Sequence, residues 1–213
     1  MLVTEDDVAR YLSDALEHQD ADIRRGSVDR IAETRYRSRP AVVDALDLIA
    51  RTDASEAVRC AAIRALGESH DGKAVTTMLA VLDEGSGTGP AASASGQVRW
   101  EAIEVLRRRA VGGADAEDLG DEVGETALRL LGSDPSRDVR VSAAGLLGYH
   151  PTRAAVRGLI DALRQRDFGV AHEAQQALHR LTGRSFDHDV ARWENWLAST
   201  ADPFRGPSDD GAS

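Results

Sequence analysis

The sequence predicts an all-α fold in which helix pairs stack into an α-solenoid. Alanine-rich segments recur along the chain, small residues occupy fixed positions within them, and the aromatic content is only 4%. Few rings and many alanines are typical of a core in which helices pack closely, unlike a sandwich or barrel filled by large side chains. The length of 213 residues and the hydrophobic content of 42% allow one domain with a substantial core.

The first predicted helix covers residues 5–17. Thr4 and Asp7 match the spacing of a capping box, which satisfies backbone N–H groups at a helix start. This helix precedes the repeated segments. We therefore expect it to cap the first pair, whose apolar side would otherwise face water.

Five segments share one helical register. Their branched residues are spaced by 35, 40, 41 and 31 positions, a small residue follows four positions later, and Ile or Leu follows eight positions later. These intervals put all three on one helix face, with the small residue where a neighbouring helix comes close. The branched residues are Ile23, Val58, Val98, Val139 and Val170, and the small ones are Ser27, Ala62, Ala102, Ala143 and Ala174.

A second pattern lies between these segments, so each repeat is a helix pair. AVVDALDLI, AVTTMLAVL and AVRGLIDAL share one form, and VGETALRLL is a looser copy. The predicted pairs cover residues 20–51, 54–83, 96–132, 135–165 and 168–199 of a single domain over residues 1–199. Asp134 and Pro135 are predicted at the N-cap and first turn of their helix. Gly67, Gly148 and Gly183 follow the last apolar residues of theirs.

Two stretches break the period, and the end of the sequence is polar. Residues 83–97 and 110–120 lengthen two connections. A solenoid tolerates surface insertions at small cost, because loop closure entropy grows only slowly with length. The alternative is a hinge or a binding loop. Residues 200–213 are rich in Pro, Gly and polar residues, and we expect them to be disordered.

The repeated form resembles a known family over roughly residues 5–199. An aspartate precedes Val-Arg, an alanine-rich helix ends in Leu-Gly, and an Ala-Val-x-x-Leu helix follows, which is similar to the HEAT-like repeats of bacterial α-solenoids, the kind also found in phycobilisome lyases. The resemblance implies a right-handed superhelix of armadillo or HEAT type. It also implies a structural ladder in which one arginine per repeat pairs with an aspartate of the stack. Those arginines are Arg24, Arg59, Arg99 and Arg140, and the aspartates are Asp20, Asp53, Asp134 and Asp138.

The nearest approach to a catalytic signature is His172 followed by Glu173. One HEAT-like enzyme, deoxyhypusine hydroxylase, holds a di-iron centre with His-Glu pairs from several repeats, which need about four to six ligands. Here one such pair occurs, and His179 lies two turns away, about 10 Å along the axis. His172 and Glu173 are therefore weak metal candidates. We expect no metal, no cofactor and no catalytic residue, since no HExxH, Cys-x-x-Cys or phosphate-cradling motif is present.

Nucleic acid and membrane partners are not expected. HEAT-like alkylpurine DNA glycosylases need a basic groove, whereas this sequence has a formal charge of −10. Trp193 and Trp196 share a face and are predicted to seal the last repeat. The single cysteine, Cys60, allows no internal disulfide, and no run of about 18 apolar residues is present, so we expect a cytoplasmic protein.

The predicted function is a non-catalytic scaffold that binds a partner protein or peptide. The resemblance implies that the second helix of each pair lines the concave face. Its exposed columns are predicted as Val43, Thr76, Glu125 and Arg157, then Asp47, Ala80, Arg129 and Asp161. A mixed-charge groove of this kind suits a peptide or helix. The candidate contact residues are Asp44, Asp47, Thr76, Glu125, Arg129, Arg157 and Asp161. The alternatives are a bilin-lyase-like or hydroxylase-like enzyme and a DNA-binding module.

Overall fold

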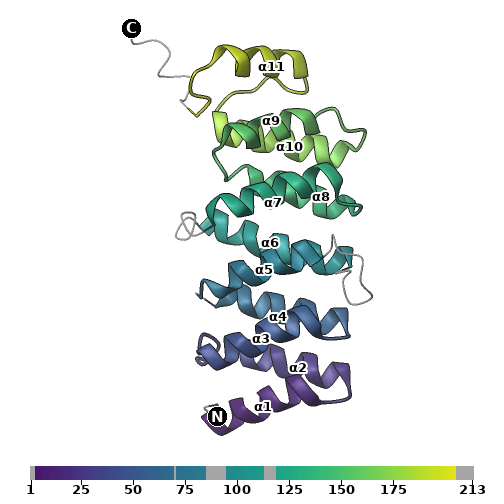
Figure 1. The fold of residues 1–213 in the computed structure, drawn as a ribbon, viewed down its shortest axis with the longest axis vertical. Helices are drawn as coiled ribbons and strands as arrows, with labels where there is room; N and C mark the ends of the chain where they lie inside the picture. The colour runs from purple at the N-terminus through teal and green to yellow at the C-terminus, as the bar shows by residue number, and fades with distance from the viewer. Residues whose placement is uncertain (1–2, 70, 85–94, 113–118, 205–213) are drawn as a thin grey trace. The chain divides into compact units, whose positions relative to one another are not determined.

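The computed structural model describes residues 3–69, 71–84, 95–112 and 119–204. In these residues the chain forms eleven helices and no strand, which confirms the predicted all-α class (Figure 1). Among them no helix has the length and apolar character needed to cross a membrane. The helices are α1 (Glu5–Glu17), α2 (Ala21–Ala32), α3 (Pro40–Thr52), α4 (Glu56–Glu68), α5 (Lys73–Glu84), α6 (Gly96–Gly112), α7 (Gly120–Ser133), α8 (Arg137–Leu147), α9 (Arg153–Ala162), α10 (Phe168–Thr182) and α11 (Val190–Ser199).

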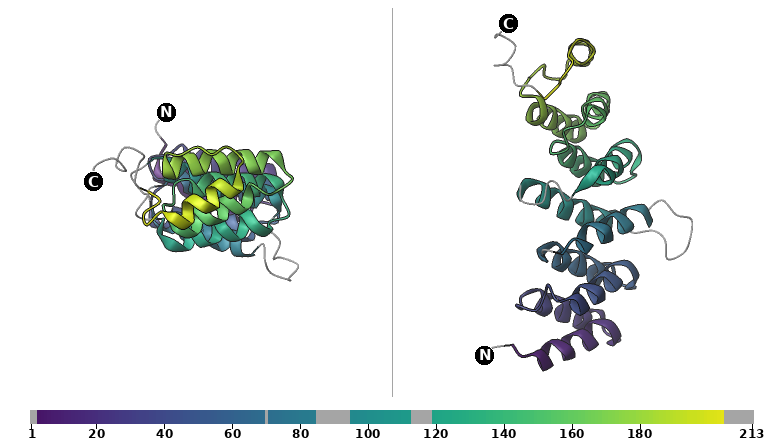
Figure 2. Two further views of the ribbon diagram at one scale, coloured as in Figure 1. Left: turned by 90° about the horizontal axis from the view of Figure 1, so that it is seen from above. Right: turned by 60° about the vertical axis from the view of Figure 1, so that its left-hand side comes forward.

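The chain divides into two compact units, Met1–Arg109 and Ala110–Ser213. Within each unit the helices are stacked pair upon pair (Figure 2). We call α2, α4, α6, α8 and α10 the A helices, and α1, α3, α5, α7, α9 and α11 the B helices. In the first unit α4 packs against α2 and α3, and in the second unit α10 packs against α8 and α9. The single domain over residues 1–199 stays a prediction.

The A helices approach one another through the small residues of the repeat. Ser27, Ala62, Ala102, Ala143 and Ala174 are all buried, and so are the Ile and Leu residues four positions after them. One branched residue differs, because Ile23 is 43% exposed whereas Val58, Val98, Val139 and Val170 are buried. Ahead of α2 lies the single helix α1 and not a complete pair. Ile23 therefore has no earlier A helix to cover it.

The helix ends follow local hydrogen bonding. α1 has the predicted capping box, in which Thr4 Oγ1 accepts from the N–H of Asp7 (3.2 Å) and the N–H of Thr4 donates to Asp7 Oδ2 (3.0 Å). Gly183 ends α10 with φ of 66°, a left-handed conformation that glycine adopts most readily.

The predicted role of Asp134 and Pro135 as N-cap and first-turn residues is wrong. Asp134 is the C-cap of α7, and Ser136 is the N-cap of α8. Asp134 Oδ1 accepts from the N–H of Ser136 (2.8 Å), a local turn that aspartate favours because its side chain can bind the backbone two residues on. Asp53 makes the same hydrogen bond to the N–H of Ser55 (2.8 Å). The aspartate therefore shapes the turn before the helix.

Parts of both predicted long connections belong to helices. Asp83 lies in α5, and α6 extends to Gly112, with Ala110 buried. Residues 85–94 and 113–118, which carry the rest of these predicted loops, lie outside the described residues. At the C-terminal end, Pro203 is buried and the N–H of Phe204 donates to Asp202 Oδ1 (2.9 Å). Residues 205–213 of the predicted disordered tail lie outside the described part of the chain.

Candidate interaction surface

The repeat arginine binds the end of the B helix that precedes it in the chain. In three repeats its Nη1 atom donates to the C-cap carbonyl of that helix. The bonded groups are Arg24 with His18 (2.8 Å), Arg59 with Asp53 (2.7 Å) and Arg140 with Asp134 (2.8 Å). A cation is favourable there because the C-terminal end of a helix carries partial negative charge. The fourth arginine, Arg99, is buried and also engaged within the chain.

Arg24 in addition forms an ion pair across the stack. Its Nε and Nη2 atoms donate to the two carboxylate oxygens of Asp53 at 2.7 and 2.8 Å, and the side chains are only 13% and 8% exposed. Burial opposes ionisation of Asp53, but hydrogen bonds from Arg24 and Ser55 outweigh it and hold the pKa of this carboxyl below its usual value. The hydrogen bond to Asp53 likewise raises the pKa of Arg24.

Two of the implied ladder aspartates have other printed partners. Asp20 is the N-cap of α2, where its side chain accepts from the N–H of Asp22 (2.8 Å). Asp138 lies beside Arg137 (3.3 Å) on the exposed side of α8. The ion-pair ladder is thus seen between Arg24 and Asp53, whereas Arg59 and Arg140 use carbonyl oxygens.

In the first unit, two predicted contact residues are used to join α3 to α5. Asp44 pairs with Lys73 (2.5 Å). Asp47 accepts from the Thr77 hydroxyl (2.8 Å), lies 3.3 Å from Arg51, and is only 14% exposed. Its predicted place in an open column is therefore wrong, because it is held between two helices. Thr76 is exposed as predicted.

Val43 also differs from its prediction. It is 1% exposed, because the buried stripe of α3 takes in both Val42 and Val43 together with Leu46. Ala80, from the second predicted column, is half-buried. The open surface of the B helices in this unit is narrower than the sequence predicts.

In the second unit, more of the predicted contact residues face solvent. Glu125, Arg129, Arg157 and Asp161 are all exposed. Within the described residues, Glu125 and Arg157 make no hydrogen bond or ion pair, whereas Arg129 is engaged. Asp161 binds Arg164 (2.7 Å), which also reaches Glu194 of α11 (2.5 Å).

Arg157 and Asp161 meet in a pocket of about 290 Å³ between α9 and α11. Its apolar part includes Ile160 and Leu197, both buried. Arg153 closes one side, because its guanidinium donates to the carbonyl oxygens of Leu197 and Thr200 at the end of α11. The pocket thus combines an apolar floor with charges of both signs.

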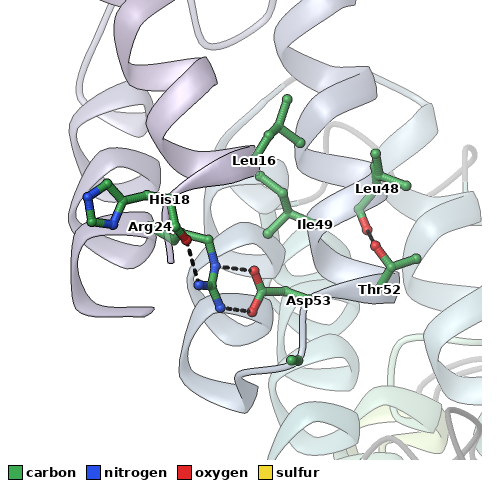
Figure 3. Close-up of a pocket in the computed structure, with 8 residues that line it drawn as sticks. Leu16, His18, Arg24, Leu48, Ile49, Thr52 and Asp53 are labelled. Atoms are coloured by element: carbon green, nitrogen blue, oxygen red, sulfur yellow. Dashed lines mark hydrogen bonds and ion pairs between the residues drawn. The ribbon is translucent and has the colours of Figure 1, made fainter. Parts of the chain in front are cut away.

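A second pocket, of about 350 Å³, lies in the first unit and was not predicted. Figure 3 shows Leu16 of α1 near Ile49 of α3, with Leu48 beyond and the pair of Arg24 and Asp53 below. Leu16 and Leu48 are 42% and 48% exposed. The sequence signal was Leu48 itself, an apolar residue directly after Asp47 and outside the buried stripe of α3.

The repeats match a known family. A family model described as PBS lyase HEAT-like repeat matches residues 58–84, which cover most of α4 and all of α5. The matched segment is one A helix followed by one B helix, the unit that recurs along the chain. The chain is a HEAT-like repeat protein. No curated protein sequence matches it.

Solved structures with the same fold cover nearly all of this HEAT-like repeat protein. An engineered protein is 21% identical, with a TM-score of 0.55, over 92% of this chain and 90% of its own. The complex of CpcE and CpcF of phycocyanin lyase from Nostoc sp. PCC7120 is 20% identical, with a TM-score of 0.59, over 86% and 67%. A designed armadillo repeat protein in complex with the peptide (KR)4 is 15% identical, with a TM-score of 0.58, over 91% and 88%. These likenesses show the solenoid fold.

The two weak metal candidates of this HEAT-like repeat protein are not part of a ligand cluster. His172 is exposed and stacks on Phe168, with ring centroids 5.7 Å apart, and Phe168 also stacks on His188 at 6.5 Å. Glu173 is half-buried. Over the residues that the structure describes, no three His, Cys, Asp or Glu side chains are grouped so that they can hold a metal ion.

Aromatic side chains close the C-terminal end of the second unit. Trp193 is fully buried, and its Nε1 atom donates to the carbonyl oxygen of Asp187 (3.1 Å). Phe186 meets it edge to face with centroids 4.8 Å apart, and Trp196 lies at 5.6 Å. Such pairs add stability beyond the area they bury. The tryptophans therefore pack the last repeat and are not presented for base stacking.

Proposed function

We propose that this chain is a non-catalytic interaction module of the cytoplasm that binds a partner protein or peptide on the exposed side of its B helices. One observation carries the proposal. Thr76, Glu125 and Arg157 hold the same position in successive B helices and are all exposed, and neither Glu125 nor Arg157 has an ionic or hydrogen-bonding partner within the described residues. Such a row supplies complementary charges to a partner without breaking contacts inside the fold.

Two of the similar structures support this proposal by what they contain. The designed armadillo repeat protein is bound to a peptide, and CpcE and CpcF form a complex with each other. A stack of repeats presents an extended surface, which is suited to contact with a chain or a helix.

An enzymatic alternative is favoured by one observation, the likeness to a phycocyanin lyase. That activity would require this chain to take up a tetrapyrrole. Mixing the protein with a bilin and recording the visible spectrum tests this: a bound chromophore that changes its absorption and survives gel filtration would favour the lyase alternative. Stoichiometric iron in the purified protein would favour a hydroxylase-like one. A gel shift with duplex DNA at low salt would favour the third alternative, a DNA-binding module.

The interaction proposal is tested by quantitative affinity capture from a lysate of the source cell. The B-helix variant is Glu125→Arg with Arg157→Glu, and the matched control on the A helix α2 is Arg25→Glu with Asp29→Arg. Each variant exchanges one acidic and one basic exposed residue, so the formal net charge stays at −10. We expect proteins enriched by the wild type to be lost with the B-helix variant and retained by the control. Equal retention by all three proteins would contradict the proposal.

A further inference from the structure

The pocket between the C-terminal ends of α1 and α3 has a geometry that commits it to one kind of ligand group. We propose that it is a docking socket for an apolar side chain followed by an arginine or lysine on the partner protein. This inference rests on the proposed function and names the partner chemistry at one site of the B helices.

The socket is apolar where a side chain would enter. Leu16 and Leu48 form its rim and are 42% and 48% exposed, while Ile49 at its floor is 3% exposed (Figure 3). Single exposed leucines are common on protein surfaces, but here two share one pocket of about 350 Å³. Ligand pockets span about 300–1,000 Å³, so this volume suits one or two side chains and not a whole helix.

The polar groups that line the socket already have partners. Arg24 donates to both carboxylate oxygens of Asp53, to the carbonyl oxygen of His18 and to that of Gln19 (3.1 Å). The Thr52 hydroxyl donates to the carbonyl oxygen of Leu48 (2.8 Å). A polar ligand group would find these donors occupied and would lose its own hydration. The inserted group is therefore apolar.

The rim favours a cation beside that group. α1 and α3 both end here, at the C-caps His18 and Asp53, and helix C-terminal ends carry partial negative charge. α1 has no basic residue in its last turn and ends in the exposed Glu17, which makes no ion pair within the described residues.

The cations already at the socket are neutralised. Arg24 is paired with Asp53, and Arg51 lies 3.3 Å from Asp47. The remaining charge is the carboxylate of Glu17, next in sequence to Leu16 of the rim. An arginine or lysine that follows the inserted side chain would meet this carboxylate.

Three dipeptides test the socket on the full chain: acetyl-Leu-Arg-amide, acetyl-Leu-Glu-amide and acetyl-Gly-Arg-amide. The readout is the methyl NMR signals of ¹³C-labelled leucine, assigned at Leu16 and Leu48. We expect acetyl-Leu-Arg-amide to shift both signals saturably with a Kd on the order of 1–10 mM. The Leu-Glu probe should bind roughly threefold more weakly because a rim charge contributes little. The Gly-Arg probe should bind roughly tenfold more weakly because it buries no side chain.

Two variants and one control sharpen the test. Leu48→Ser should abolish the shift at Leu16, and Glu17→Arg should reverse the preference between the Leu-Arg and Leu-Glu probes. Val111→Ser, at an apolar residue that is 54% exposed on α6, should change nothing. The inference is overturned by the absence of saturable shifts with acetyl-Leu-Arg-amide, by equal affinities for the three probes, or by a preference that Glu17→Arg leaves unaltered.

A second copy of the chain is the competing occupant. Sedimentation would then show a dimer that is lost in Leu48→Ser, the dipeptides would not bind, and the inference would fall. Failure of the socket is distinguishable from failure of the proposed function. If no dipeptide binds while capture still depends on Glu125 and Arg157, only the socket is lost. If the dipeptides bind but capture ignores the B helices, the interaction surface proposed along α7 and α9 is lost.

Discussion

Arg24 of α2 grips Asp53 at the end of α3 through two hydrogen bonds of 2.7 and 2.8 Å, and its remaining nitrogen binds the carbonyl oxygen that ends α1. One side chain thus joins the capping helix, the first A helix and the first B helix. We expect Arg24→Ala to lower the free energy of unfolding by about 2–3 kcal/mol, because it leaves a largely buried carboxylate unpaired. Urea denaturation measures this. Arg25→Ala, on the same helix with a 48% exposed side chain, is the control and should cost less than about 0.5 kcal/mol.

The same pair makes stability depend on acid pH. Because the pKa of Asp53 is lower in the folded chain than in the unfolded chain, its contribution is fully present above the unfolded pKa, near about 4. It is lost as pH falls through the folded pKa. We expect the free energy of unfolding of the wild type to fall below about pH 4, and that of Asp53→Asn to fall less steeply. Parallel pH profiles for the two proteins would mean that this carboxyl titrates alike in both states.

The small column of the A helices is expected to reject charge. Ala143 is fully buried, so Ala143→Asp places a carboxylate where it has no water, which costs several kcal/mol and should unfold the second unit. Circular dichroism at 222 nm during heating reads this out. Gln176→Asp, at an exposed position of α10, is the control and should melt close to the wild type. A normal melt for Ala143→Asp would show that the register of α8 is wrong.

Two glycines near helix ends should respond oppositely to alanine. Gly183 has φ of 66°, so Gly183→Ala should destabilise by about 1 kcal/mol. Gly132 lies inside α7, and a methyl group there would meet no atom within 4 Å, so Gly132→Ala should stabilise by up to about 1 kcal/mol. Chemical denaturation of both variants checks the pair. The same sign for both would contradict the assigned backbone conformations.

Glu173 provides a direct test of the weak metal candidate. Because His172 stacks on Phe168 and no ligand cluster surrounds it within the described residues, Glu173→Ala should change the free energy of unfolding by less than about 0.5 kcal/mol. Metal content, measured by mass spectrometry after dialysis, should not differ from that of the wild type. A metal that is lost together with stability would restore the enzymatic hypothesis.

The A helices were predictable because their packing is written locally. A small residue four positions after a branched one and four before a leucine defines a buried face without reference to any other segment, and Ala62 and Ala143 are buried accordingly. The B helices were less predictable, since their polar residues find partners on other helices. Asp47 carries no local sign that Thr77 binds it.

The helix ends and the pocket needed the folded chain for a similar reason. Asp134 before Pro135 fits the start of one helix or the end of another, and the hydrogen bond to Ser136 decides which. The pocket depends on where α1 and α3 end relative to each other. Leu16 and Leu48 each read as an ordinary helical leucine until both are found in one pocket.

Site-specific photo-crosslinking in the source cell tests the central claim most directly. A benzoylphenylalanine replaces Thr76, exposed on the B helix α5, or Gln176, exposed on the A helix α10. Our account predicts a discrete crosslinked protein from position 76 that is absent from position 176. Crosslinks from position 176 alone, or the same products from both positions, would contradict binding on the B helices.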